Sequence, residues 1–524
     1  MNTTSDSVAE SPVQQLRDTS GLAGHPRGLT TLFFTEMWER FSFYGMRAIL
    51  VLYMVAAPGL GGLGYDTPHA TAIYGTYSMA AFLLSLPGGI IADQWLGTRR
   101  SVLIGGIIIA CGHFTMAIPA VPTFFAGLVL VACGTGLLKP NVSALVGGLY
   151  SQDDDRRDSG FSIFYMGINI GAFLAPLVCG FLAEAEPFKN MLRSFGIDPV
   201  NSWHFGFAAA GVGMLLGLVV FWLQRGRLEH VGDRLAAKPA PSTQKQKRQG
   251  GLPQTAIYVA LGVFTVIGTA LAGSNWQNVL PFLLAFDALV LVIMMGRQEQ
   301  LTVAEWKRLA VMGIYFVVTI AFWSAYEQKG SSLSLFAKEM VQRNIGSFVV
   351  PAAWFQSLTA LYVILLAPVF AALWVRLGRR QPSSLAKLAL APLLIGSGYA
   401  AFAIMCSSLH VGAKINPLWL AGLFLFEVFG ELCLSPIGLN LVTKLAPVKL
   451  VGLMMGLWFF GSSFGYKLAG YFAGFYVPVP ARLTMLYGGI AAGLFVVAAL
   501  LFLMMPTMRK LVGDESAKAA THAH

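Results

Sequence analysis

Residues 28–57 read GLTTLFFTEMWERFSFYGMRAILVLYMVAA, and this stretch decides the class of fold. It is mostly apolar, and it exceeds the roughly 20 residues that a helix needs to cross the hydrocarbon core of a bilayer. Because hydrocarbon offers the backbone no partner, each amide must be hydrogen-bonded inside its own segment. The stretch is therefore predicted to be a membrane-spanning helix, although it carries four charged side chains.

The same pattern recurs along the 524-residue chain, in which 56% of residues are hydrophobic and 12% are charged. Soluble domains average about 25% charged residues, so this composition excludes an ordinary soluble protein. We predict an all-α integral membrane protein with fourteen transmembrane helices, ordered six, two and six along the chain. The predicted spans are 28–57, 68–92, 101–120, 123–149, 159–183, 203–224, 253–273, 276–296, 308–339, 348–376, 385–408, 416–445, 450–477 and 483–506.

The two six-helix blocks contain a similar loop sequence at corresponding positions. Gly88–Arg100 reads GGIIADQWLGTRR and Leu373–Arg380 reads LWVRLGRR, so each joins two helices by a short turn that ends in paired Arg. Two matching halves are a transporter architecture, with the substrate site between them near mid-membrane. The first segment resembles the cytoplasmic-loop signature of the major facilitator superfamily. That resemblance implies that Asp93, Arg99 and Arg100 hold neighbouring helix ends together in one state of a gate.

We therefore predict a major facilitator superfamily fold, with two six-helix bundles plus two extra inserted helices. The parts are a cytoplasmic tail, the first bundle, a cytoplasmic linker with two lateral transmembrane helices, the second bundle and a second cytoplasmic tail. Their predicted bounds are 1–27, 28–224, 225–307, 308–508 and 509–524.

Lys and Arg are concentrated in the loops that would lie on one side of the membrane. They follow every second predicted span, whereas the loops 58–68 and 273–275 contain none. Cytoplasmic loops carry this excess, so both termini are predicted to be cytoplasmic. The bias accounts for the net charge of +11, and no nucleic-acid partner is predicted. Residues 1–27 lack the apolar core of a signal peptide.

Neither a metal site nor an ATP-driven pump is predicted in this chain. The five Cys lie in apolar blocks without the spacing of metal ligands. The Gly-rich stretches lack the GxxxxGK[ST] phosphate loop. No cofactor other than the coupling proton is expected.

Charged residues inside the spans are the candidate functional groups, because each costs at least ~2.5 kcal/mol at the bilayer centre on insertion scales. Lys139, Glu327 and Glu431 lie in three other spans. One face of the helix 28–57 gathers six polar or aromatic side chains within an arc of about 140°: Glu36, Glu39, Arg40, Phe43, Tyr44 and Arg47.

The cations lie mainly in the first half of the chain, and Glu327 and Glu431 lie in the second. Opposite charges would pair when the halves close, and protonation of a carboxylate would weaken the pair, which links a proton gradient to a conformational switch. A cavity with one positive and one negative wall also fits a zwitterion with separated termini. A static ion pair that only holds the halves together is the alternative.

Several motifs resemble those of the proton-coupled oligopeptide transporter family, in the right order from Arg27 to about Met505. EMWERFSFYG, from Glu36, is similar to that family's ExxERFxYY signature. PGGIIADQWLGTRR and FSIFYMGINIGA resemble its two longer signatures, and the two inserted helices resemble those of bacterial members. Further matching blocks are GTGLLKPN, WHFGF, FWSAYEQ, FQSL, GELCLSPIGL and MGLWFF.

The resemblance implies a proton-coupled symporter that imports di- and tripeptides by alternating access. Arg40 and Lys139 would bind the peptide carboxylate, and Glu431 would bind its amino terminus. The implied proton-coupling residues are Glu36, Glu39, Arg40, Lys139 and Glu327. The other implied substrate-binding residues are Tyr44, Tyr165, Asn169, Trp323, Ser435, Trp458 and Phe459. The implied gating residues are Arg47, Glu327, Asp93, Arg99 and Arg100.

Some positions depart from the family pattern. Phe43 and Phe82 stand where relatives carry tyrosines, and Thr359 stands where they carry an asparagine that binds the peptide. These changes make the site more apolar, so we expect a preference for apolar peptides. Glu427 and Lys467 also lie inside spans, and the family pattern assigns no role to them.

The implied partners are a small peptide, protons and the lipid bilayer, and the implied location is a bacterial inner membrane, with the protein as a monomer. A carrier of the same fold for another substrate, such as nitrate or a glucoside, is the second hypothesis. An intramembrane enzyme or a receptor-like sensor is the third, but no catalytic constellation stands out in the sequence.

Overall fold

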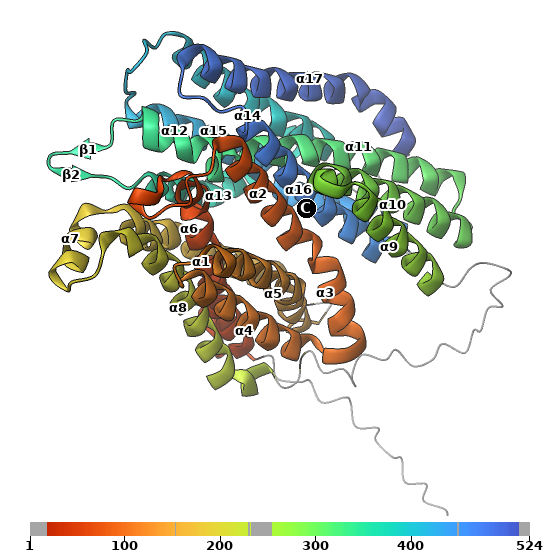
Figure 1. Cartoon of the computed structure of the whole chain (residues 1–524). Helices are drawn as coiled ribbons and strands as arrows, with labels where there is room; N and C mark the ends of the chain where they lie inside the picture. Colours follow the sequence, from red (N-terminus) through yellow and green to blue (C-terminus); the bar gives the residue numbers. More distant parts are fainter. Residues whose placement is uncertain (1–17, 152–153, 229–230, 232–253, 448–449, 513–524) are drawn as a thin grey trace, which may run out of the picture.

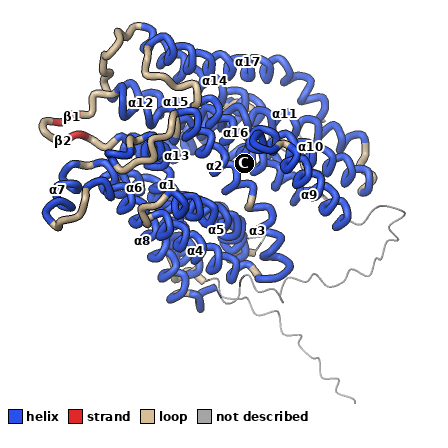
Figure 2. The backbone as a smooth tube through the Cα atoms, viewed as in Figure 1, coloured by secondary structure: helices blue, strands red, loops and turns tan. Residues whose placement is uncertain are grey.

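The computed structural model describes residues 18–151, 154–228, 231, 254–447 and 450–512 (Figure 1). Almost all of the regular structure in these residues is helical (Figure 2). The exception is a hairpin in which strand β1 (Asn344–Ile345) pairs antiparallel with β2 (Phe348–Val349). The prediction of a helical protein is thus confirmed apart from this hairpin.

Each of the fourteen predicted spans coincides with at least one helix in the described residues. Ten helical segments in this part of the chain are long and apolar enough to cross a membrane. The helices are α1 (Arg27–Val55), α2 (Thr67–Leu83), α3 (Ser85–Ile91), α4 (Thr98–Met116), α5 (Val121–Gly148), α6 (Arg157–Glu184), α7 (Glu186–Ser194), α8 (Ser202–Leu223), α9 (Gln254–Leu271), α10 (Trp276–Gln298), α11 (Val303–Tyr326), α12 (Ser332–Met340), α13 (Ser357–Leu377), α14 (Ser384–Ser407), α15 (Pro417–Leu445), α16 (Val451–Ala473) and α17 (Pro480–Val512).

The predicted span 68–92 is broken into α2 and α3, with a π-helical turn η3 (Ala92–Leu96) after them. Pro87 accounts for the break, because it has no N–H to donate to a carbonyl one turn earlier. Close packing follows directly, since a Cβ on Gly88 would lie 2.1 Å from the carbonyl oxygen of Gly136. Only glycine at position 88 lets α3 approach α5 this closely.

The predicted span 308–339 is also broken. After Tyr326 the chain forms a 3₁₀ turn η7 (Glu327–Gly330), and Ser331 has φ −132° and ψ −98° before α12 begins. The continuous helix predicted here is therefore wrong, and Glu327 lies at the break instead of inside a helix. Two further differences are the amphipathic helix α7, which was not predicted, and α17, which runs beyond the predicted bundle end at residue 508.

The helices pack in two groups (Figure 1). In the first group α1 lies against α6 and α8, and α4 lies against α5; in the second, α14 lies against α15 and α17, and α11 against α16. The two groups meet where α2 packs on α16 and α6 packs on α13. The pair α9 and α10 pack on each other, and α10 touches α16.

Small residues allow the contact between α2 and α16. A Cβ on Gly470 would lie 2.7 Å from Cα of Gly75, so the two backbones touch directly. Hydrogen bonds also join the two helix groups near the contact of α6 with α13. The Ser357 hydroxyl donates to the Phe173 carbonyl at 2.8 Å, and Nε2 of Gln356 donates to the Ala48 carbonyl at 3.2 Å.

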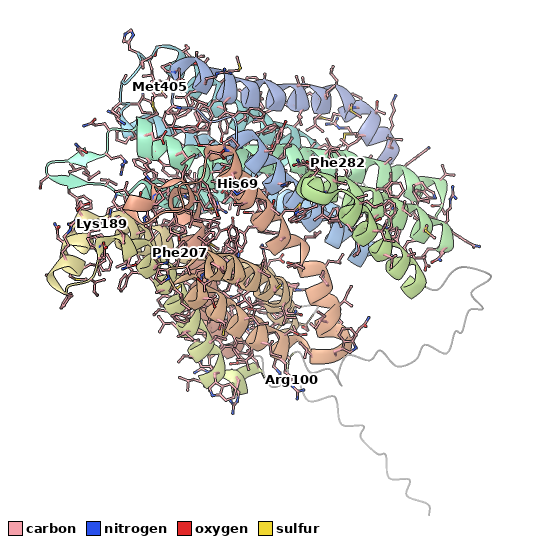
Figure 3. The ribbon with its side chains drawn as sticks, viewed as in Figure 1. His69, Arg100, Lys189, Phe207, Phe282 and Met405 are labelled. Carbon is pink, nitrogen blue, oxygen red and sulfur yellow. The ribbon has the colours of Figure 1, made fainter. Side chains whose placement is uncertain are left out.

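Side chains distinguish the interior from the outer face (Figure 3). Phe207 is fully buried in the first group, where its ring centroid lies 5.2 Å from that of Tyr53. Phe282 on α10 is 77% exposed. Several other large apolar side chains of α9 and α10 are exposed with it, including Val266, Leu271 and Leu289, and an exposed apolar surface of this kind fits contact with lipid.

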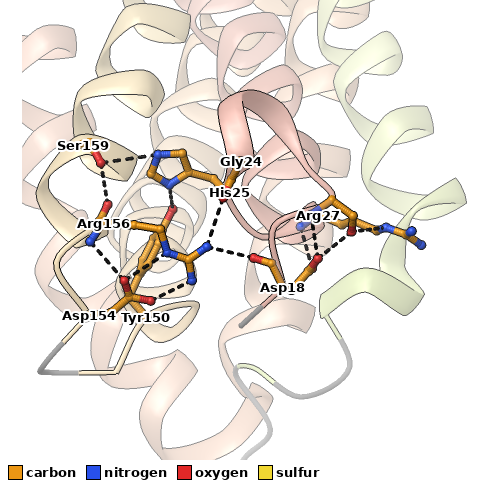
Figure 4. A network of polar contacts seen from close by, with 9 residues as sticks. Asp18, Gly24, His25, Arg27, Tyr150, Asp154, Arg156 and Ser159 are labelled. Atoms are coloured by element: carbon orange, nitrogen blue, oxygen red, sulfur yellow. Dashed lines mark hydrogen bonds and ion pairs between the residues drawn. The ribbon is translucent and has the colours of Figure 1, made fainter. Parts of the chain in front are cut away.

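A polar network ties the start of the described chain to the loop before α6 (Figure 4). Nη1 of Arg156 donates to the carbonyls of Asp18 and Gly24, both at 3.0 Å. The buried ring of His25 contacts the Tyr150 hydroxyl through Nδ1 at 2.8 Å and the Ser159 hydroxyl through Nε2 at 3.3 Å. Part of the predicted N-terminal tail is therefore attached to the first helix group.

Candidate functional site

A polar cavity of about 310 Å³ lies where the two helix groups meet. Helices α1, α5 and α6 of the first group and α11, α15 and α16 of the second contribute to its walls. Most of the predicted site residues line it: Glu36, Arg40, Tyr44, Arg47, Lys139, Tyr165, Asn169, Trp323, Glu327, Glu431 and Ser435.

A larger groove of about 800 Å³ lies between α11, α16 and α17. Its lining is mostly apolar, and Arg482 is the one charged side chain that contributes to it. A groove without a carboxylate cannot provide walls of opposite charge. The smaller cavity is therefore the candidate site.

One wall of the cavity is built on the charged face of α1. Nε of Arg40 lies 3.1 Å from Oε1 of Glu36 and also contacts Oε2 of Glu39. The spacing of a helix explains the first contact, because residues four apart lie on the same face. All three side chains are buried, and Oε2 of Glu36 and Nη2 of Arg40 have no hydrogen-bond partner among the described residues. One guanidinium group thus balances two carboxylates.

Lys139 lies on α5 in the same wall, immediately before Pro140. Its Nζ is 3.2 Å from the centroid of the Phe82 ring, which is a cation–π contact. The structure does not give Lys139 an ion pair with Glu36 or Glu39 within the described residues. The lysine is thus placed in the predicted cavity with an aromatic partner, and its charge is balanced over a longer distance.

The opposite wall carries Glu431 on α15. The hydroxyl of Tyr326 donates to Oε2 of this carboxylate, and the hydroxyl of Tyr165 donates to Oε1 at 3.3 Å. Tyr165 belongs to α6, so this contact joins the two helix groups across the cavity. The amide nitrogen of Asn169 donates to the Tyr165 carbonyl one turn earlier in α6 at 2.9 Å.

An ion pair also joins the two groups, at the break after α11. Nη1 of Arg47 lies 3.1 Å from Oε2 of Glu327, and the Tyr74 hydroxyl donates to the same oxygen at 3.1 Å. Both charged side chains are at most 4% exposed. The break in the helix positions Glu327 so that it meets both α1 and α2.

Several residues of the cavity wall were not predicted from the sequence. Lys329 is the most important, because it adds a fourth cation to Arg40, Arg47 and Lys139; its Nζ lies 3.2 Å from the centroid of the Tyr326 ring. A signal was present, since a lysine inside the predicted span 308–339, two residues after Glu327, is as costly as the charges that were singled out. The other wall residues that were missed include Tyr326, Gln356 and Tyr466.

The structure does not bring every predicted residue to the cavity. Asp93 lies in η3 and Arg99 and Arg100 lie in the first turn of α4, and none of the three lines it. Trp458 and Phe459 belong to α16, but their side chains lie outside the described residues. Thr359, which stands where relatives carry an asparagine, lines the cavity, and its hydroxyl donates to the Gln356 carbonyl.

The comparison with protein families decides the identity. The model of the POT family matches residues 99–488, which is most of the chain. The chain belongs to the POT family. The resemblance to proton-coupled oligopeptide transporters predicted from the motifs is therefore confirmed.

Relatives in the POT family align over almost the whole chain. A peptide transporter of Yersinia enterocolitica is 40% identical over 511 aligned positions, which cover 94% of this chain and 96% of that protein. A di-/tripeptide transporter of Lactococcus lactis is 34% identical over 504 positions, with 94% and 97% covered. The POT protein is therefore a multi-pass membrane protein and a transporter, not an enzyme.

Solved structures of POT family members are also similar. A crystal structure of a POT peptide transporter in complex with alafosfalin has a TM-score of 0.81 and 38% identity, and the match covers 94% of this chain and 97% of that one. Another POT family transporter, solved in complex with 5-aminolevulinic acid, has a TM-score of 0.78 and 29% identity. The helix packing described above is thus that of a transporter family.

Proposed function

We propose that this chain is a proton-coupled symporter that imports di- and tripeptides by alternating access. The observation that carries the proposal is the pair of opposite walls in one cavity, with Arg40 and Lys139 on one side and Glu431 on the other. A peptide is a zwitterion whose charges are separated by its backbone, so two such walls can bind both ends. The peptide transporters among the relatives support this substrate class.

The peptide carboxylate would bind Arg40 and Lys139, and the amino terminus would bind Glu431. Charge-assisted hydrogen bonds of this kind are the strong ones in proteins. The backbone and side chains of the peptide would contact the remaining wall, which is formed by Tyr44, Tyr165, Asn169, Trp323 and Ser435. Trp458 and Phe459 would also contact the peptide, as the family resemblance implies.

Proton coupling would follow from the charge balance on α1. Glu36 and Glu39 share Arg40, and Lys139 supplies the second positive charge of this wall. A peptide carboxylate adds one negative charge to a group that is already balanced. Protonation of Glu36 or Glu39 restores the balance, so peptide and proton bind together more favourably than either alone.

The ion pair between Arg47 and Glu327 would be the gate. It joins α1 to η7 close to the contacts of α2 with α16 and of α6 with α13, which lie at the predicted extracellular ends of these helices. The described conformation would thus be closed to the outside. Protonation of Glu327 would weaken the pair and allow the groups to separate there. Asp93, Arg99 and Arg100 would act in the gate on the cytoplasmic side.

We further propose the major facilitator superfamily arrangement with fourteen spans, in which α9 and α10 are the lateral pair. The domain boundaries would be those predicted from sequence, except that α17 extends the second bundle to Val512, and both termini would lie in the cytoplasm. The protein would act as a monomer in a bacterial inner membrane, with protons as the coupling ion and no other cofactor.

Uptake of labelled dialanine into proteoliposomes under an imposed pH gradient tests the proposal. We expect accumulation that depends on an acidic exterior and that unlabelled dipeptides inhibit. Uptake that ignores the gradient would contradict symport. Inhibition by nitrate or a glucoside, but not by dipeptides, would show that the substrate is of another class.

A further inference from the structure

Glu427 is a buried carboxyl group that the proposed cycle does not use. It lies on α15 one turn before Glu431, its exposed fraction is 0%, and it is not part of the cavity lining. Its Oε1 lies 3.0 Å from the hydroxyl of Tyr399 on α14. This contact lies behind the wall that would bind the peptide amino group.

The hydrogen bonds of Tyr399 can be counted, because a phenol has a single proton to donate. Its oxygen lies 2.8 Å from the carbonyl oxygen of Ala325 and 3.0 Å from Oε1 of Glu427. The carbonyl can only accept, so the tyrosine proton is directed to Ala325. The contact with Glu427 is then a hydrogen bond only if the carboxyl group supplies the proton.

The second oxygen of Glu427 leads to the same result. Oε2 is buried and has no hydrogen-bond partner among the described residues. An ionised carboxylate with an unsatisfied oxygen at this depth would carry the full cost of desolvation, whereas the neutral acid carries much less. Both oxygens therefore indicate a protonated side chain in this conformation.

The groups that face Glu427 include one cation that can change its partner. Lys329 of η7 and Glu327 and Glu431 interact with it electrostatically, along with Tyr399. Helix α13 contributes the apolar Val363 to this region, and α16 contributes Tyr466 to the nearby cavity wall. Lys329 lines the cavity and contacts the Tyr326 ring, without an ion pair to any of the three carboxylates among the described residues.

We propose that Glu427 is a second proton-carrying site, which adds one proton to each transport cycle. The inference rests on the proposed symport. Glu427 takes up its proton while the cavity is open to the outside, and this proton crosses with the peptide. After the two groups have closed on the outside, the peptide amino group at Glu431 repels Lys329, which moves towards Glu427. The proton then leaves Oε1 of Glu427 for the water of the cavity that opens to the cytoplasm, Tyr399 turns its O–H from Ala325 to the carboxylate, and the Lys329 ammonium balances the new charge.

The proton-to-peptide ratio tests this site. It is measured in proteoliposomes from the membrane potential at which net dialanine flux reverses under a fixed peptide gradient. We expect Glu427→Gln, which keeps a donor for Tyr399, to lower the ratio by one proton per peptide. Peptide counterflow, which needs no net proton movement, serves as the control that the variant is folded and binds peptide.

An unchanged ratio in Glu427→Gln with normal counterflow would overturn the proposal. If that variant shows no counterflow, Lys329→Met is the second test. Loss of the cation leaves the proton bound to Glu427, so we expect Lys329→Met also to lower the proton-to-peptide ratio by one. An unchanged ratio in Lys329→Met would overturn the proposal. Wild-type flux that is indifferent to pH would instead contradict the proposed symport itself, so the two failures are distinguishable.

Discussion

Arg47 and Glu327 form an ion pair in which one guanidinium nitrogen reaches both carboxylate oxygens. Nη1 lies 3.1 Å from Oε2 and 3.3 Å from Oε1, although the residues are 280 positions apart. The pair joins α1 of the first helix group to the turn after α11 in the second. Because both side chains are buried, each depends on the other for its solvation.

Removal of one partner should therefore destabilise the described conformation. We expect Arg47→Ala to cost about 3–5 kcal/mol, because it leaves a buried carboxylate unpaired except for Tyr74. Thermal unfolding of the purified protein in detergent measures the loss. The double variant Arg47→Glu with Glu327→Arg serves as the control and should recover part of the stability. If the single and double variants are equally unstable, the pair does not act as a unit.

The sequence predicts most of the fold for physical reasons that can be named. A charge inside an apolar block must find a partner, but only the family resemblance implied that Arg47 and Glu327 act together in a gate. Apolar length identified the blocks, and each of them coincides with a helix in the described residues. Helix α1 shows the limit of this criterion. The charges on one of its faces keep it out of the ten segments that are long and apolar enough to cross a membrane.

The differences between sequence and structure arise from tertiary contacts. The break at Glu327–Gly330 was missed although residues 327–332 read EQKGSS, because the apolar residues on both sides suggest one continuous span. The partner of Glu427 was missed because Tyr399 lies on another helix, and helix packing alone brings the two together. The pairing of Lys139 with the Phe82 ring could not be foreseen, since a lysine has several rotatable bonds and the family pattern suggested carboxylates.

Glu431 should determine affinity for the free amino terminus of a peptide. We expect Glu431→Gln to weaken competition by dialanine roughly 10- to 100-fold, because a hydrogen bond to a charged group contributes about 1.5–3 kcal/mol. Competition by N-acetyl-dialanine, which lacks the ammonium group, is the matched measurement. It should change little, and an equal loss for both ligands would contradict the assignment.

Glu39 and Lys139 should be required for coupling to the proton gradient. We expect Glu39→Gln and Lys139→Ala to abolish gradient-driven uptake of dialanine, because each removes one charge from the balance around Arg40. Counterflow exchange of peptide, which needs no gradient, checks that each variant is folded. Gradient-driven uptake at the wild-type rate in either variant would refute its role in coupling.

The cavity-wall positions that depart from the family pattern should determine which peptide side chains the protein prefers. Phe82 and Thr359 line the cavity, and the Thr359 hydroxyl is already bonded to the backbone. We expect apolar dipeptides to compete better than charged ones in uptake assays. Thr359→Asn should improve affinity at most about 5-fold, since one net hydrogen bond contributes about 1 kcal/mol. Equal inhibition by apolar and charged dipeptides would contradict the preference.

The network around His25 should make stability depend on pH. Burial, followed by the charge of Arg156, lowers the pKa of His25 below its ordinary value of 6.5. The hydroxyl of Ser159 donates to the Arg156 carbonyl at 2.9 Å, so it accepts from Nε2 of His25, and Nδ1 is left to accept from Tyr150. This arrangement needs the neutral ring.

Because the folded pKa is depressed, the stability that His25 contributes is present above pH 6.5. It is lost as the pH falls below 6.5 and through the folded pKa. We expect the melting temperature of the wild type to fall more steeply between pH 7 and pH 5 than that of His25→Gln, which keeps a donor and an acceptor but cannot titrate. All other residues are the same in both proteins, so their contributions cancel in the difference. Parallel curves over this range would show that His25 does not control the network.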